Sequence, residues 1–227
     1  MAKDNKNDAS QKQLQEAASK TEVFFEKNGK TLSWCAIALL AVAAVAFAWY
    51  RFIYQPKCAE AQAEMASIEQ RFTAVADTAD FSAVLYGDGE QYGFEQIISK
   101  YGSKAGKAVY LYAGICALNL GEYDQAVSYL KKYNGKEEIM ASRALKLTGD
   151  AYVGLGKLEA ALGCYEKAAT ACSNVYAADA LLNAGVVCEE LGKTDKALKY
   201  YKEIKESYPQ SMEAVEIDKY ISRIESK

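Results

Sequence analysis

Three copies of one pattern decide the fold of this chain: YLYAGICALNLGEYDQAVSYLKKY at residues 110–133, LKLTGDAYVGLGKLEAALGCYEKA at 145–168 and LLNAGVVCEELGKTDKALKYYKEI at 181–204. Their starts lie 35 and 36 residues apart. Self-similarity at such a period is typical of proteins built from stacked helix pairs. We therefore expect each copy to form a helical hairpin that packs on the next one.

Four positions recur at this period, and each has a mechanical role in a helical hairpin. We expect the first glycine to let two helices approach closely, and the second to make the tight turn that needs positive φ. The alanine lets the returning helix pack on the first, and a bulky residue fills the space between them. In chain order these positions are Gly114, Gly149 and Gly185; Gly121, Gly156 and Gly192; Ala126, Ala161 and Ala197; and Leu130, Tyr165 and Tyr201.

The pattern resembles the tetratricopeptide repeat, whose unit carries glycine, small, glycine, alanine and aromatic positions in this order. The resemblance implies an all-α solenoid with three clear repeats. A degenerate repeat precedes them, because GFEQIISKYGSKAG at 93–106 parallels YYKEIKESYPQSMEA at 200–214. The chain has only two prolines and is rich in Ala, Leu, Lys and Glu, which also favours helices.

Both ends of the array have an expected closing element. The first helix of the degenerate repeat should come from the stretch between Pro56 and about Ala83, followed by a loop at 86–91. At the far end, Ser211 is expected to cap a helix that runs to about Ser226 and covers the last repeat. The predicted apolar stripe of that helix is Val215, Ile217, Tyr220, Ile221 and Ile224.

An uncharged run, LSWCAIALLAVAAVAFAWY, occupies residues 32–50. As a helix it would extend roughly 28 Å, close to the hydrocarbon thickness of a bilayer. Trp34 and Trp49 lie near its ends, where amphipathic rings settle at the headgroup level. We expect a transmembrane helix at 31–54. A buried core helix and a cleavable signal peptide are the alternatives, the latter because Ala-Phe-Ala at 46–48 fits a small-x-small cleavage pattern.

Basic residues near this run predict its orientation. More of them precede the run than follow it, and basic flanks stay in the cytoplasm. The N-terminus is therefore predicted to be cytoplasmic after a single crossing, and the repeat domain to lie on the far side of the membrane, which is the periplasm if the membrane is a bacterial inner membrane. The basic residues are Lys12, Lys20, Lys27 and Lys30 before the run, and Arg51 and Lys57 after it.

The expected organisation has five parts. Residues 1–30 form a cytoplasmic tail that is largely disordered, because polar residues dominate and few apolar ones are present to pack. The transmembrane helix follows at 31–54, and a long helix with the degenerate repeat at 55–104. The three repeats take 105–210, and the capping helix takes 211–227.

A short motif before the apolar run, FFEKNGK at 24–30, is followed by a single span and then the array. This order resembles the single-span accessory subunit of the bacterial Sec translocon, the YfgM type. The stretch LYGDGEQYGFEQIISKYGSKAG at 85–106 is similar to tetratricopeptide proteins of Bacteroidetes. The first resemblance implies an inner-membrane anchor, a periplasmic repeat domain, contact with translocon subunits and a role with exported or envelope proteins.

The resemblance also implies a binding surface, because tetratricopeptide arrays bind extended peptides or helices along the face formed by the first helix of each pair. The register gives this face apolar ends and a charged middle. We therefore expect hydrophobic, weakly specific recognition of unfolded or helical segments. The alternative is a solvated face, or one covered by a neighbouring helix. The predicted groove residues are Leu111, Ile115, Asn119, Arg143, Lys146, Asp150, Leu182, Asn183, Val186 and Glu189.

Composition argues against several other functions. Histidine is absent, which removes the commonest general base and metal ligand. The 27 basic and 30 acidic residues are mixed along the chain, so we expect no nucleic-acid partner. No catalytic residue, metal ligand or cofactor is predicted. The cysteines form no CxxC pair, and we expect small apolar packing roles for them, with a disulfide at Cys172 as the alternative in an oxidising compartment.

These observations predict a membrane-anchored protein-binding module, not an enzyme. It would present its groove outside the cytoplasm and assist export, folding or assembly of envelope proteins in a chaperone-like way. The alternative is a structural scaffold that docks one envelope or cell-wall complex, for which Arg143 and Lys146 would matter more than apolar area. An enzyme with carboxylate chemistry is a third hypothesis and would need a deep pocket with paired acidic residues. Sequence leaves the oligomeric state open.

Overall fold

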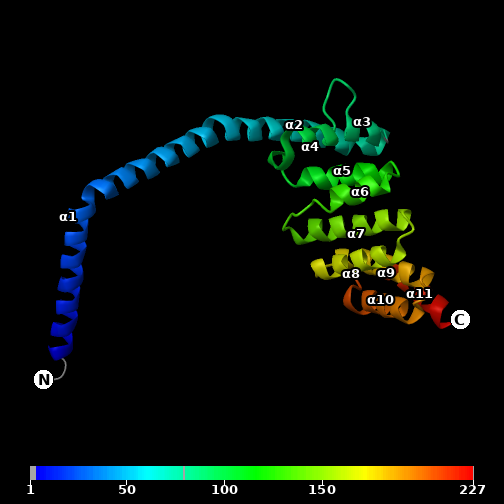
Figure 1. Ribbon diagram of the computed structural model, residues 1–227. Helices are drawn as coiled ribbons and strands as arrows, with labels where there is room; N and C mark the ends of the chain where they lie inside the picture. Colours follow the sequence, from blue (N-terminus) through cyan, green and yellow to red (C-terminus); the bar gives the residue numbers. More distant parts are fainter. Residues whose placement is uncertain (1–3, 79, 227) are drawn as a thin grey trace. The chain divides into compact units, whose positions relative to one another are not determined.

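The computed structural model describes residues 4–78 and 80–226, with side chains from Lys27 to Val75 and from Asp80 to Ser226. Helices account for most of this part of the chain (Figure 1). It divides into two compact units, Met1–Pro56 and Lys57–Lys227, which are described separately.

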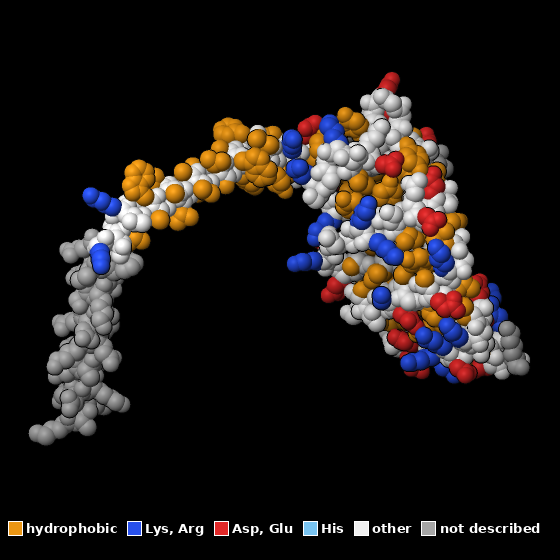
Figure 2. All heavy atoms as spheres, in the orientation of Figure 1, with side chains coloured by type: hydrophobic (Ala, Val, Ile, Leu, Met, Phe, Trp, Pro, Cys, Tyr) orange, Lys and Arg blue, Asp and Glu red, His pale blue; other side chains and the backbone are white. Residues whose placement is uncertain are grey.

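The first unit is a helix with an exposed apolar surface. α1 runs over Asp4–Trp49, and a π-helical turn, η1 (Tyr50–Tyr54), continues it. The ring of Tyr54 lies 5.7 Å from that of Trp49 and 5.6 Å from that of Tyr50. No side chain between Lys27 and Pro56 is buried, and Figure 2 shows hydrophobic side chains along this stretch.

The N-terminal part of α1 differs from the expectation of a largely disordered tail, because the backbone is helical from Asp4 onward. Residues 4–28 contain no proline or glycine, and Ala, Gln, Glu and Lys are strong helix formers. The sequence argument considered the shortage of apolar residues but not this propensity. Within the described residues, one helical stretch, Lys27–Val75, is long and apolar enough to cross a membrane.

The second unit is a stack of helical hairpins, which confirms the predicted all-α solenoid (Figure 1). In each hairpin the second helix packs antiparallel on the first, and the first helix of the next hairpin packs on it in turn. The three hairpins are α5 (Ala108–Asn119) with α6 (Tyr123–Leu130), α7 (Glu138–Gly154) with α8 (Leu158–Ala171), and α9 (Tyr176–Glu190) with α10 (Thr194–Ser207).

Close approach within each hairpin depends on the first recurring glycine. A Cβ atom added to Gly149 would lie 2.5 Å from Cε1 of Tyr165, and one added to Gly114 would lie 2.5 Å from Cγ of Leu130. Gly185 meets Tyr201 in the same way. The second set of glycines turns the chain with positive φ, at 76°, 69° and 71° for Gly121, Gly156 and Gly192. Both predicted roles are confirmed.

The degenerate repeat contains one more helix than the sequence predicts. α2 (Gln55–Thr78) is its first helix and α4 (Phe94–Tyr101) its second, while α3 (Phe81–Tyr86) is inserted between them and packs on α5. Asp80 caps α3, because its Oδ1 accepts a hydrogen bond from the backbone N–H of Ala83 at 3.1 Å. A short 3-10 turn, η2 (Gly102–Ala105), then leads to α5.

α2 is attached to the array by apolar and polar contacts. The ring of Phe72 lies 5.9 Å from that of Phe94 and 5.0 Å from that of Tyr112. The hydroxyl of Tyr101 donates a hydrogen bond to Oε1 of Glu60 at 2.8 Å. Four side chains of α2 are fully or almost fully buried: Ala61, Met65, Ile68 and Val75.

The C-terminal helix is shorter than predicted. A 3-10 turn, η3 (Glu213–Val215), precedes α11 (Ile217–Glu225), and the hydroxyl of Ser211 accepts a hydrogen bond from the N–H of Ala214 at 3.2 Å. Ile217 and Ile221 are buried against the last hairpin, but Val215 is 83% exposed. Val215 was therefore wrongly assigned to the apolar stripe, because the helix starts only after it.

The glycine contact predicts opposite effects for two equivalent changes. Gly149→Ala should lower the free energy of unfolding by about 1–3 kcal/mol, because the methyl group overlaps the Tyr165 ring. The methyl group added by Gly163→Ala in α8 has no other atom within 4 Å. This change should raise the free energy of unfolding by about 0.5–1 kcal/mol, because alanine has the higher helix propensity. Denaturation of the full-length protein followed by circular dichroism measures both; equal stability of the two variants would contradict the packing described here.

Candidate functional site: an open stretch of the first-helix face

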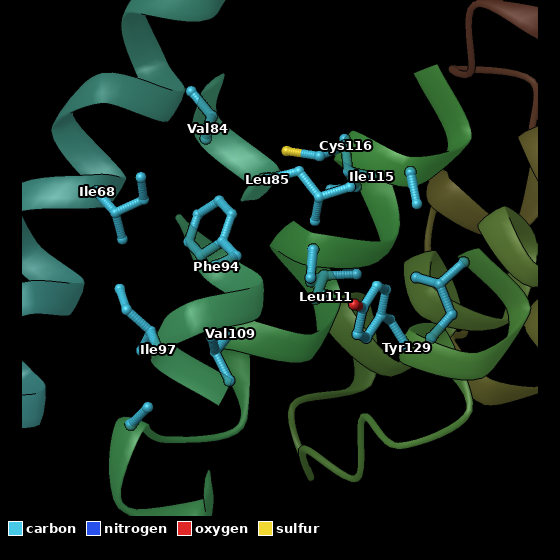
Figure 3. Packing of buried hydrophobic residues seen from close by; sticks show 14 of the residues in the cluster. Ile68, Val84, Leu85, Phe94, Ile97, Val109, Leu111, Ile115, Cys116 and Tyr129 are labelled. Atoms are coloured by element: carbon cyan, nitrogen blue, oxygen red, sulfur yellow. The ribbon is translucent and has the colours of Figure 1, made fainter. Parts of the chain in front are cut away.

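The first helices of the hairpins, α5, α7 and α9, form one face of the stack, and the chain itself covers the N-terminal end of this face. Leu111 and Ile115 of α5 are only 3% and 9% exposed. They belong to the hydrophobic cluster that also contains Leu85 of α3 and Tyr129 of α6 (Figure 3). The structure thus corrects the prediction that Ile115 faces a groove, because the inserted α3, which the sequence does not predict, packs on α5. Leu111 is also largely buried, but it lines a pocket described below, as predicted.

α11 contacts the other end of this face. Arg223 of α11 forms an ion pair with Glu189 at 2.5 Å, and Tyr201 donates a hydrogen bond to the same carboxylate at 2.8 Å. The ring of Tyr220 lies 5.3 Å from that of Tyr201. Glu189, predicted to line the groove, is therefore engaged by the chain's own C-terminal helix.

Four other predicted groove residues have structural roles or remain only partly accessible. The amide of Asn119 donates to the carbonyl of Ile115 at 2.8 Å, and that of Asn183 donates to the backbone carbonyl of Asp179 at 2.8 Å. Leu182 packs against the C-terminal hydrophobic cluster, and Val186 is half-buried. None of the four lines a pocket described below.

An open pocket of about 430 Å³ remains in the middle of this face, between α7 and α9. Three large apolar side chains there are unusually exposed: Ile139 at 41%, Met140 at 41% and Tyr176 at 58%. We call this opening between α7 and α9 the α7 pocket. It is lined by Ile139, Met140, Ser142, Arg143, Lys146, Leu147, Tyr176 and Asp179.

A second pocket, of about 360 Å³, lies between α5 and the start of α7. It shares Met140 with the α7 pocket, so the two form one continuous surface. We call this one the α5 pocket, and the two together the open groove. The α5 pocket is lined by Lys107, Ala108, Leu111, Tyr112, Tyr133, Glu137 and Met140.

Lys146 forms ion pairs that fix the charged side chains at one side of the open groove. Its Nζ lies 3.2 Å from Asp150 and 3.5 Å from Asp179, and thus joins α7 to α9. The hydroxyl of Tyr165 donates a second bond to Asp150 at 2.8 Å. Burial alone would lower the pKa of Lys146, but the two carboxylates outweigh it, so the pKa is raised. Lys146 and Asp150 are predicted groove residues that act mainly as structural partners of each other.

Arg143 differs from Lys146 although it lies one helical turn away. Its side chain is exposed, lines the α7 pocket and forms no ion pair or hydrogen bond with any described residue. The neighbouring Ser142 is buried and donates to the carbonyl of Ala168 at 2.9 Å, which fixes this turn of α7 against α8. Arg143 is therefore a cation on a rigid helix that is available to a ligand.

Sequence reasoning missed the apolar part of the groove. Ile139, Met140 and Tyr176 stand at the beginnings of α7 and α9, outside the repeating positions. Their exposure follows from the gap between successive first helices, which a single sequence does not give. The available signal was two adjacent apolar residues, Ile139 and Met140, in a segment otherwise rich in Lys and Glu.

The described residues offer little for catalysis. They contain no group of three His, Cys, Asp or Glu side chains that could hold a metal ion, and their six cysteines are free. Burial raises the pKa of the Cys116 thiol to about 12, which keeps it protonated and unreactive. Cys172 is 2% exposed, and its Sγ lies 2.8 Å from Oδ1 of Asn174. Its thiol is free, so the structure contains no disulfide at this position.

Comparison with known proteins agrees with this architecture. Residues 108–136 and 141–211 each match a model of the tetratricopeptide repeat, and these stretches cover the three hairpins. The chain thus contains tetratricopeptide repeats, and its repeat unit is a protein–protein interaction module.

Solved structures with the same fold include MamA. One crystal structure of the MamA protein superposes with a TM-score of 0.55 at 18% identity, over 72% of this chain and 83% of that one. A second crystal structure of MamA gives a TM-score of 0.51 at 20% identity, over 68% of this chain and 92% of that one. At these identities the likeness concerns the fold alone. No curated protein sequence matches the chain.

The groove charges predict different effects for two neighbouring substitutions. Lys146→Met leaves Asp150 and Asp179 without their shared cation and should destabilise the protein by about 1–2 kcal/mol. Arg143→Met removes no internal partner and should leave the unfolding midpoint unchanged. Thermal denaturation of the two variants checks this, and an equal loss for both would show that Arg143 has a structural partner.

Proposed function

We propose that this protein is anchored in the bacterial inner membrane by α1 and uses the open groove outside the cytoplasm to bind segments of exported or envelope proteins. By reversible binding it would assist their export, folding or assembly. The observation that carries the proposal is the exposure of Ile139, Met140 and Tyr176 around one pocket. Rigid helices hold these side chains in the open, and contiguous exposed apolar surface of this kind is typical of a protein-binding site.

The character of the groove favours binding over catalysis. Its floor is apolar, and Asp150 and Asp179 both form ion pairs with Lys146. A peptide could place apolar side chains in the α7 and α5 pockets, which lie on either side of Met140. Such a site accepts different sequences of similar polarity, since methionine adapts its shape to several partners. This suits a chaperone-like role with several clients.

Membrane anchoring is supported by the exposed apolar surface of α1. Trp34 is 72% exposed, Leu39 is 71% exposed and Phe47 is 68% exposed, which is costly in water and favourable in lipid. The aromatic turn η1 follows at one end of the stretch, where Trp and Tyr rings suit the headgroup region. Contact with the Sec translocon rests on the resemblance of the residues before the span, at 24–30, and is the most specific part of the proposal.

The orientation has a direct test. The excess of lysines before the span supports a cytoplasmic N-terminus and repeats outside the cytoplasm. Alkaline phosphatase, which is active only outside the cytoplasm, should therefore be active when fused after Lys227 and inactive when fused before Met1. Green fluorescent protein does not fluoresce after export as an unfolded chain. It should therefore fluoresce when fused before Met1 and stay dark when fused after Lys227. An active N-terminal phosphatase fusion would overturn the proposed topology.

The binding surface is tested by crosslinking in native membranes. A photoreactive residue replacing Met140 or Tyr176 should form adducts with many exported proteins and with translocon subunits, because both positions are exposed in the groove. The same residue at Met212, which is 87% exposed at the C-terminal end of the stack, is the matched control.

Three outcomes separate the hypotheses. Many client adducts at the groove positions alone support the chaperone-like role. One dominant folded partner would replace it with a scaffold that docks a single envelope or cell-wall complex. Equal adducts at Met212 and Met140, or none at the groove, would show that the open groove is not the binding surface.

A further inference from the structure

The edge of the stack beside the open groove carries an excess of positive charge. The loops that lead into α5 and α7 contain Lys107, Lys132 and Lys136, and Arg143 lies on the first turns of α7; all four are exposed. We call these residues the basic edge. Figure 2 shows blue side chains at the left margin of the repeats, where these loops lie, and mostly red ones at the upper right margin.

The positive charge of the basic edge is not compensated within the described part of the chain. None of its four cations forms an ion pair with a described residue, whereas Lys146 and Arg223 each have a carboxylate partner. Lys107 donates a hydrogen bond to the backbone carbonyl of Asn134 at 3.0 Å. This contact holds the side chain without neutralising its charge.

Acidic groups near the edge are too few to balance it. Two exposed carboxylates lie in the same stretch, Glu137 in the loop before α7 and Glu138 as its first residue, so the four cations of the basic edge outnumber them. Glu137 is near the hydroxyl of Tyr133, at 3.5 Å, and forms no ion pair. The charged residues that line the two pockets are the cations Lys107, Arg143 and Lys146 and the carboxylates Glu137 and Asp179. A ligand in the groove would therefore meet a lining with one net positive charge.

The charge and the apolar floor lie side by side. Lys107 lines the α5 pocket and Arg143 lines the α7 pocket, in each case with Met140 in the same lining. An occupant that satisfies both features needs apolar side chains a few ångströms from carboxylates. A flat anionic lipid surface would pair with the lysines but would leave two pockets of about 430 and 360 Å³ unfilled.

We infer that the groove selects acidic amphipathic segments: stretches of a partner protein with apolar residues on one side and Asp or Glu beside them. Apolar side chains fill the α5 and α7 pockets, and a carboxylate pairs with Arg143 while others meet the lysines of the basic edge. Charge complementarity of this kind gives selectivity and faster association. The inference rests on the proposed function, because it names the partner chemistry of the same groove.

The test uses the full-length protein in uncharged phosphatidylcholine nanodiscs and three fluorescent peptides of one amphipathic design. Their apolar faces are identical leucines and methionines, and their polar faces carry glutamate, glutamine or lysine. Fluorescence anisotropy at low and high salt gives the affinities. The glutamate peptide should bind about tenfold more tightly than the glutamine peptide at low salt, and the difference should shrink as salt screens the charges.

Two charge reversals make the test specific. The double variant Lys136→Glu with Arg143→Glu should lose the preference for the glutamate peptide and gain one for the lysine peptide, which a merely unfolded protein could not do. Lys219→Glu on α11 is the matched control, since Lys219 is also exposed and forms no ion pair with a described residue. It should leave all three affinities unchanged.

Other results would overturn the inference in distinguishable ways. Equal binding of the glutamate and glutamine peptides, unaffected by the reversals, would leave a protein-binding groove without acidic selectivity. Reversals that abolish binding to phosphatidylglycerol vesicles but not to the peptides would assign the basic edge to a lipid surface. No binding of any peptide, with no crosslinks at Met140 or Tyr176, would reject the proposed function itself.

Discussion

Close contact between a glycine on the first helix of each hairpin and a bulky side chain on the second controls the spacing of the whole stack. At Gly149 the ring of Tyr165 occupies the volume where a side chain would be, and the hydroxyl of that ring reaches Asp150. Asp150 in turn binds Lys146, which also reaches Asp179 on the next first helix. One packing constraint is thus linked, through three side chains, to the wall of the open groove.

The position of the open groove follows from what covers the rest of the first-helix face. At the N-terminal end α3 packs on α5, and Ile115 becomes a core residue. At the C-terminal end Arg223 of α11 binds Glu189. Between these ends, Ile139 and Met140 on the first turn of α7 and Tyr176 on that of α9 are exposed among the described residues of the repeat unit. The chain therefore closes its own solenoid at both ends and leaves a limited surface, rather than a full groove, for partners.

The repeat, its glycine roles and the apolar helix could be predicted from sequence, because each depends on local spacing: a period of 35 or 36 residues, positive φ, or an uncharged run. The site could be predicted only in part. Arg143 and Lys146 were placed at the groove by the repeat register. The burial of Ile115 was missed because it depends on α3, a short inserted helix between Asp80 and Gly87 with no counterpart in the repeat. Ile139 and Tyr176 were missed because exposure depends on the neighbouring hairpin.

Hydrogen–deuterium exchange of the full-length protein in nanodiscs, with and without the glutamate-bearing amphipathic peptide, tests the central claim most directly: that the surface around Met140 binds protein segments. Occupation of the open groove predicts slower exchange at the start of α7, residues 138–147, and at the start of α9, residues 176–183, with α6, α8 and α10 unchanged. Slower exchange confined to α6, α8 and α10, or no change anywhere, would contradict it.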